Sequence, residues 1–277
     1  MALDPDKYFI IVPNLLGNGL SSSPSNTPAP YDRANFPKVS IYDNVTFQHQ
    51  LVTKKFDIKK ISLVVGWSMG GLQSYQWGAI YPDMVERIAP ICGAAKTWSH
   101  NYVVLNGLKA SLTASVTSNE LNKLTPDDMR TVGRVYAGWG LSQAFFREKL
   151  YREMGCDSLE DFVENILEKS FMNINPHNFL TMLWTGQNAD ISANPIYKGN
   201  FEEALHNIKA HAYVMPGKTD LFCTAGDNEY EAKHIPNSAY IPIDSIWGHF
   251  AGRGINSADN KFINDNLKSL LALRANR

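Results

Sequence analysis

The stretch that decides the fold is LVVGWSMGGLQ, residues 63–73. An apolar run ends at Gly66, and a helical pattern follows Ser68. Gly66, Ser68 and Gly70 match the pattern G-x-S-x-G, which places a serine on a sharp turn between a strand and a helix. Side chains two positions before and after this serine are expected to collide with the strand and the helix, so both positions are glycine. Gly71 is expected to let the helix pack closely on the sheet.

The serine has two interpretations. It is either a nucleophile that the turn holds in strained backbone geometry, or only a residue that suits such a turn. The predicted helix begins at Met69, and the first N–H groups and partial positive charge of a helix stabilise an oxyanion. Met69 N–H is therefore the expected oxyanion donor. The strand before Ser68 and the helix after it favour the nucleophile.

The first third of the chain alternates between strand and helix. Apolar runs at residues 8–13, 61–66 and 87–95 predict short buried strands, and helical spacing covers residues 42–56 and 69–81. Strands that alternate with helices indicate a mostly parallel sheet with helical crossovers on both faces.

From about Trp98 onward helical patterns dominate, and no convincing strand interrupts them until residue 204. The alternation then resumes, with strands expected at 211–217 and 239–243 and helices at 226–235 and from 259. A helical block between βα units is best interpreted as a cap over the carboxyl edge of the sheet, where ligands bind in such folds. The predicted organisation is an α/β core of residues 1–97 and 205–277 with a helical cap at 98–204.

A serine nucleophile needs a base, and the base needs an orienting acid. In the strand–serine–helix arrangement the expected order is serine, acid and histidine, the last two placed after later strands. Asp220 follows the strand at 211–217, and His249 follows the strand at 239–243. Asp220 could instead cap a helix and His249 could be an ordinary loop histidine. Two other acids, Asp227 and Asp244, are less well placed.

Composition excludes several other classes of function. The 26 basic and 27 acidic residues give a net charge of −1 with no basic stripe, which argues against nucleic-acid binding. No apolar run is long enough for a membrane helix, and no cluster of ligand residues has metal-binding spacing. No G-x-G-x-x-G follows a strand, so a dinucleotide cofactor is not expected. Three widely spaced cysteines favour a reduced, cytoplasmic protein.

Several segments outside the cap resemble the homoserine O-acetyltransferase family of α/β-hydrolases. The matching pieces are DPDKYFIIVPNLLGNG, FPKVSIYDNV, VVGWSMGGLQSYQWGAIYPDMVERI, KTDLF and WGHFAG. The resemblance implies an α/β-hydrolase fold with Ser68 as nucleophile, Asp220 as orienting acid and His249 as base. It also implies that an acyl group passes from a small-molecule substrate to the serine and then to an alcohol or water.

Two positions depart from the acetyltransferase pattern. Trp67 precedes the serine where those enzymes usually have glycine, and Phe250 follows the histidine where they typically have an aspartate that helps hold the amino-acid acceptor. A phenyl ring cannot pair with an ammonium group. We therefore predict hydrolysis of a small ester or related acyl compound without a cofactor. The alternative is an O-acetyltransferase for homoserine or another small alcohol, with acetyl-CoA as co-substrate.

The front of the chain raises a third interpretation. In the family the segment DPDKYFII is internal and follows the first strands and a loop that supplies the second oxyanion donor, whereas here it begins at residue 4. We expect those first strands and half of the oxyanion hole to be missing. A shortened chain would be a weak or inactive hydrolase-fold binding module, and its exposed sheet edge would favour a homo-oligomer.

Overall fold

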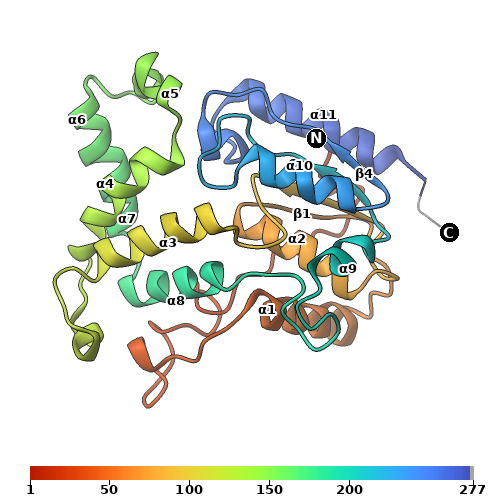
Figure 1. The fold of residues 1–277 in the computed structure, drawn as a ribbon, viewed down its shortest axis with the longest axis horizontal. Coiled ribbons are helices and arrows are strands. Elements are labelled where there is room, and N and C mark those ends of the chain that lie inside the picture. The colour runs from red at the N-terminus through yellow and green to blue at the C-terminus, as the bar shows by residue number, and fades with distance from the viewer. Residues whose placement is uncertain (275–277) are drawn as a thin grey trace. The chain divides into compact units, whose positions relative to one another are not determined.

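The structure is a computed structural model, and it describes residues 1–274. The chain divides into two compact units (Figure 1). The first contains residues 1–13, 41–97 and the chain from 189 onward, and the second contains residues 14–40 and 98–188. Among the described residues, the first unit holds the four strands, and the second is helical.

The two units differ from the predicted boundaries at residues 189–204 and 14–40. The first of these segments stays with the sheet because it pairs with the chain after β2 (Arg87–Ile91): Thr97 N–H donates to Ala189 O (2.8 Å), and Ile191 N–H donates to Ala95 O (3.1 Å). The second lies with the helical unit, where the Thr185 hydroxyl donates to Val39 O (2.7 Å). Neither hydrogen bond can be predicted from the spacing of apolar residues, so the predicted boundaries missed both segments.

The sheet has the strand order β1-β2-β3-β4, and every neighbouring pair is parallel, as the alternation of strands and helices predicts. Its register aligns Val64, Ile88, Ala212 and Ser238 in one row across the four strands. The strands are β1 (Val64–Trp67), β2 (Arg87–Ile91), β3 (His211–Val214) and β4 (Ser238–Tyr240).

The two faces of the sheet are covered by different helices because neighbouring side chains on a strand point to opposite faces. Ile88 faces α2 (Met69–Ile80), where a Cβ on Gly78 would approach it to 3.4 Å. Arg87, its neighbour, faces α11 (Ser257–Ala272) and donates to Leu270 O at 3.1 Å. The Tyr240 hydroxyl, two residues beyond the aligned row on β4, donates to Ala225 O of α10 (Ala225–His234) at 3.1 Å. Helices α2 and α10 therefore cover one face, and α11 covers the other.

The helices predicted at 42–56, 69–81, 226–235 and from 259 are present in that order, and α9 (Phe201–His206) is an additional helix that was not predicted. The helices of the first unit are α1 (Ile41–Gln50), continued by a π-helix at Leu51–Lys55, α2 (Met69–Ile80), α9, α10 (Ala225–His234) and α11 (Ser257–Ala272), with a 3-10 helix η6 (Gly248–Gly252) before the last. Asn256 caps α11 by accepting from Asp259 N–H at 3.0 Å.

The predicted strand at residues 8–13 is wrong. This segment has no regular structure, and Phe9 and Val12 are 71% and 86% exposed. Its apolar run has the composition of a buried strand, but a strand exists only where a neighbour supplies its backbone hydrogen bonds. The sheet formed by the described residues ends at β1, so the segment remains unpaired there.

The second unit is held together by packing between helices and by one buried carboxylate. Glu168 is buried and pairs with Arg130 of α4 (2.9 Å) and with Arg134. A Cβ on Gly133 would lie 3.1 Å from Leu167 O, so α4 approaches its neighbour closely. The elements are α3 (Ser99–Leu112), α4 (Asp128–Gly140), α5 (Gln143–Arg147), α6 (Leu159–Phe162), α7 (Lys169–Met172) and α8 (Pro176–Gln187), with 3-10 turns η1 (Arg33–Asn35), η3 (Ser118–Lys123) and η4 (Leu150–Arg152) and a π-turn η5 (Val163–Glu168).

Within residues 1–274 no helix is both long and apolar enough to cross a membrane.

Candidate active site

Ser68 lies on the turn between β1 and α2, and its backbone is strained. Its φ of 56° and ψ of −119° are rare for a residue with a side chain. The Ser68 amide donates to Ile91 O at the end of β2 (2.9 Å), which ties the turn to the neighbouring strand. The strained turn predicted from G-x-S-x-G is therefore confirmed, and it lies at the carboxyl edge of the sheet.

The glycines around Ser68 confirm part of the steric prediction. A Cβ on Gly66 would lie 2.4 Å from the Gly70 backbone, so the turn excludes a side chain there. A Cβ on Gly71 would lie 2.9 Å from Gly93 Cα, where α2 approaches the chain after β2. The collision predicted for Gly70 is wrong, because its Cβ would meet nothing within 4 Å. A side chain at position 70 would therefore have free space, whereas the Gly70 backbone itself excludes a side chain at position 66.

The difference between Gly66 and Gly70 can be tested by measuring the free energy of unfolding of alanine variants. We expect Gly66→Ala to lower the free energy of unfolding by about 3 kcal/mol, because the new methyl group meets backbone atoms that cannot rotate away. Gly70→Ala should leave it unchanged or raise it by up to about 1 kcal/mol, since alanine is preferred to glycine in a helix. Urea denaturation followed by circular dichroism measures both, and equal losses would contradict the steric assignment.

His249 is buried in η6, on the loop after β4. The loop after β3 holds it in place: Gly248 N–H donates to Thr219 Oγ1 (3.2 Å), and the Thr219 hydroxyl donates to Ser245 O (2.8 Å). A Cβ on Gly217 would lie 2.8 Å from Gly248 O, so the two loops pack backbone against backbone. The histidine is thus fixed by the segment that also carries Asp220.

The Asp220 carboxylate accepts from three donors. Oδ1 accepts from the amides of Phe222 (2.7 Å) and Cys223 (3.0 Å), and Oδ2 lies 2.8 Å from His249 Nδ1. Both oxygens are therefore partnered, and the carboxylate cannot rotate without breaking one of these bonds. The alternative interpretation, in which Asp220 only caps a helix, does not fit, because Thr224 caps α10.

The structure brings the three predicted residues together in series. His249 Nε2 lies 2.8 Å from Ser68 Oγ, and its other ring nitrogen contacts Asp220. The exposed fractions of Asp220 and His249 are 4% and 1%, so little water competes for this contact. In this arrangement an imidazole can take the serine proton while a carboxylate holds its second nitrogen.

The rival acids are engaged elsewhere. The Thr224 hydroxyl donates to Asp227 Oδ2 (2.6 Å) in the first turn of α10. Asp244 is exposed and forms an ion pair with Lys218 (3.1 Å). Sequence order alone could not separate these acids from Asp220, and the packing of the two loops does.

Two aromatic rings that the sequence analysis did not assign to the site lie against His249. The ring centroid of Trp67 is 5.2 Å from that of the imidazole, and the centroid of Phe222 is 5.0 Å from it. Their positions in the sequence could have indicated this, because Trp67 adjoins Ser68 and Phe222 lies two residues after Asp220. Together they limit the orientations that the imidazole can adopt.

Phe250 is a core residue, only 2% exposed, and the guanidinium of Arg253 stacks over its ring at 4.6 Å. The position after His249 therefore carries a buried apolar ring and no carboxylate.

Two cysteines lie near the acid, and neither fits the role of nucleophile. Burial raises the pKa of both Cys92 and Cys223 well above the ordinary thiol value, and the negative charge of Asp220 raises it further. A thiol reacts as the thiolate, so both stay unreactive at neutral pH. Among residues 1–274, no group of three or more histidine, cysteine, aspartate and glutamate side chains is placed to hold a metal ion.

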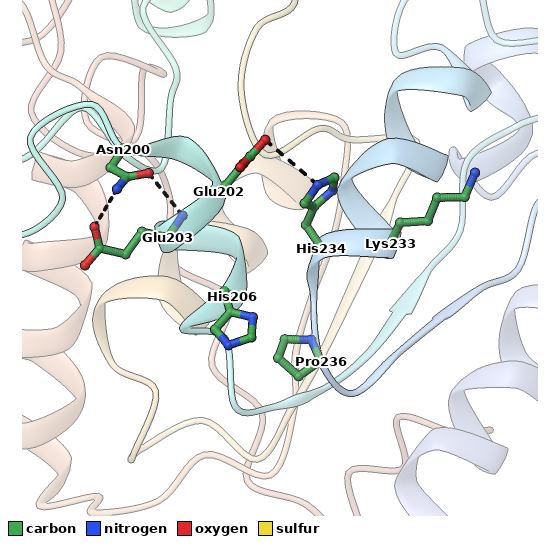
Figure 2. A pocket seen from close by; sticks show the side chains of 7 residues that line it. All are labelled: Asn200, Glu202, Glu203, His206, Lys233, His234 and Pro236. Carbon is green, nitrogen blue, oxygen red and sulfur yellow. Dashed lines mark hydrogen bonds and ion pairs between the residues drawn. The ribbon is translucent and has the colours of Figure 1, made fainter.

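A separate hollow lies between α9 and α10 (Figure 2), and it contains none of the predicted site residues. Its side chains are Asn200, Glu202, Glu203, His206, Lys233, His234 and Pro236. Asn200 caps α9 by accepting from Glu203 N–H (3.3 Å), and His234 lies 3.9 Å from Glu202. These contacts stabilise the two helices.

Comparison with known proteins gives the family. Residues 1–177, more than half of the chain, match the family model described as the alpha/beta hydrolase fold. An ethyl acetate hydrolase from Pseudomonas veronii is 38% identical over 252 residues, which are 90% of this chain and 72% of that protein. A homoserine O-acetyltransferase from Chlorobium chlorochromatii is 26% identical over 286 residues, covering 97% of this chain and 78% of that protein.

Among solved structures, that of the acetyl esterase MekB superimposes with a TM-score of 0.94 at 36% identity, covering 98% of this chain and 79% of that one. The four parallel strands, the helices on both faces and the strained serine turn agree with these matches. The chain belongs to the α/β-hydrolase fold family.

Proposed function

We propose that this protein is a serine esterase that hydrolyses small acetate esters through an acyl-enzyme. The observation that carries the proposal is the series of contacts from Ser68 Oγ to His249 and on to Asp220, with 2.8 Å at each step. A serine hydroxyl is inert unless a base can take its proton, and this arrangement supplies one.

The proton positions follow from the partners of His249. The Asp220 carboxylate only accepts hydrogen bonds, so Nδ1 carries the proton of the neutral imidazole and Nε2 is free to accept one. Ser68 Oγ–H donates to Nε2, which takes the proton as the oxygen attacks the ester carbonyl. Asp220 stabilises the imidazolium that results.

The attack forms a tetrahedral intermediate with a negative oxygen. Met69 is the first residue of α2, so its N–H has no acceptor within the helix and is the proposed donor to that oxygen. His249 Nε2 then gives its proton to the departing alcohol, leaving an acetyl group on Ser68. Water, deprotonated by the same nitrogen, attacks the acyl-enzyme and releases acetate and the free serine.

The choice of water over homoserine as acceptor rests on two observations. The relatives named for ester hydrolysis are 38% and 36% identical to this chain, against 26% for the homoserine O-acetyltransferase. Phe250 also stands where the acetyltransferase pattern has a carboxylate, and it is buried. Both support a hydrolase, as the sequence analysis predicts.

The assay for this proposal supplies ethyl acetate and p-nitrophenyl acetate to the full chain, without and with acetyl-CoA and homoserine. We expect acetate release that needs no acetyl-CoA, and no acetyl-CoA consumption when homoserine is added. Consumption of acetyl-CoA that depends on homoserine or another small alcohol would replace the proposal with a transferase. A protein inactive in every assay would instead fit the binding-module interpretation.

The lid role of the helical block at 98–204 stays a prediction, as do the absence of a cofactor, the cytoplasmic location and the homo-oligomer.

A further inference from the structure

Trp67 connects the two halves of the candidate site. It is the residue before Ser68, and its indole Nε1–H donates to the backbone carbonyl of His249 (2.9 Å). One rigid side chain therefore joins the backbone that carries the serine to the backbone that carries the histidine. The indole ring also contacts the imidazole, with 5.2 Å between ring centroids.

The indole occupies space that a side chain at position 252 would need. A Cβ on Gly252 would lie 2.3 Å from Trp67 Cδ1 and 2.8 Å from Ile91 Cγ2. Trp67 and Ile91 are register partners on β1 and β2, so their side chains stand next to each other on one face of the sheet. The last residue of η6 packs directly on this pair, and only glycine fits without a shift.

We propose that Trp67 is a positioning residue that sets the distance between Ser68 and His249, and that Gly252 is glycine because the indole requires the space. The inference rests on the proposed esterase function, since it concerns how the same base is placed. Trp67 touches the base loop and takes no part in proton transfer.

The physical reason is that the serine and the histidine belong to different segments, and their hydrogen bond alone is a weak constraint. A single hydrogen bond contributes little net stability, whereas a base displaced by about 1 Å can lower the rate about 100-fold. The indole adds a second hydrogen bond and a close packed contact between the same segments. The His249 loop is then held from Thr219 on one side and from Trp67 on the other.

Trp67→Phe is the first test, because it keeps an apolar ring while removing the N–H donor together with the five-membered part of the indole. We expect kcat for p-nitrophenyl acetate to fall about tenfold, KM to stay within about twofold, and fluorophosphonate labelling to slow by the same factor as kcat. Trp77→Phe is the control: Trp77 is buried, and its Nε1–H likewise donates to an oxygen acceptor, Gln48 Oε1 (3.0 Å), far along α2 from the serine. Its kcat should match the wild type.

Gly252→Ala tests the packing half of the inference. We expect kcat to fall about 100-fold relative to the wild type, but by less than about threefold relative to Trp67→Ala when the two changes are combined. Trp67→Ala removes the ring atom that the methyl group would meet at 2.3 Å and leaves Ile91 room to shift. Gly226→Ala is the control, since a Cβ there meets nothing within 4 Å, and it should leave kcat unchanged.

The outcomes separate this inference from the proposed function. A wild-type protein without esterase activity would contradict the proposed function itself. If the wild type is active, the inference is overturned by a Trp67→Phe variant with full kcat, by one that changes only KM, or by equal losses from Gly252→Ala in both backgrounds. If Gly252→Ala does not fold, Trp67→Phe still decides between these results.

Discussion

Ser68→Ala is expected to abolish ester hydrolysis and covalent labelling by a fluorophosphonate probe. The variant keeps the backbone turn but removes the oxygen that attacks the carbonyl and receives the acyl group. Removing the serine of a comparable triad lowers kcat by roughly 10⁶-fold, so no turnover above background should be detected. Gel detection of the labelled protein and release of p-nitrophenol measure the two effects independently.

Ser74→Ala is the matched control for the nucleophile. Ser74 lies on α2, the helix that begins directly after Ser68, is buried, and its hydroxyl donates to Gly70 O (2.9 Å). This variant should retain labelling and turnover. Labelling that persists in Ser68→Ala would place the nucleophile at another residue.

His249→Ala is expected to produce the second large loss, on the order of 10⁵–10⁶-fold in kcat. Without the imidazole, nothing takes the proton from Ser68 Oγ, and Asp220 Oδ2 loses the partner that it has at 2.8 Å. Oδ1 keeps its two amide donors, so the acid loop should persist. Steady-state kinetics together with circular dichroism test the prediction.

A variant with a larger side chain than alanine guards against misfolding, because His249 is fully buried. His249→Asn fills more of the space than alanine and should be as inactive, with a native spectrum. His234→Ala, in the hollow of Figure 2, should leave kcat unchanged. Turnover that survives both substitutions at position 249 would mean that another group serves as the base.

The sequence predicts the fold of the first unit well where local patterns and neighbours agree. The strand before Ser68 and the helix after it appear as β1 and α2, and the strands before Asp220 and His249 appear as β3 and β4. A short apolar run predicts a strand, closely spaced glycines predict a sharp turn, and helical spacing of apolar residues predicts a helix. Each of these patterns is complete within a few neighbouring residues. Parallel order then brings the carboxyl ends of β1, β3 and β4 to one edge.

The same local patterns are wrong at residues 8–13 and at Gly70. An apolar run reports that a segment can be buried, but burial and strand pairing depend on what lies beside it. A glycine in a motif likewise does not reveal which direction its missing side chain would take. At Gly66 that direction meets backbone, and at Gly70 it meets open space.

By itself, the sequence determined the α/β alternation, the strained turn that holds Ser68, and the order of serine, acid and histidine, because these depend on residues near each other in the chain. Only the tertiary structure decided which acid contacts His249, and that Trp67 donates to the histidine backbone while Gly252 leaves room for its ring. Those contacts join segments far apart in the chain. Their distances are set by strand register and loop packing, for which a single sequence carries no local signal.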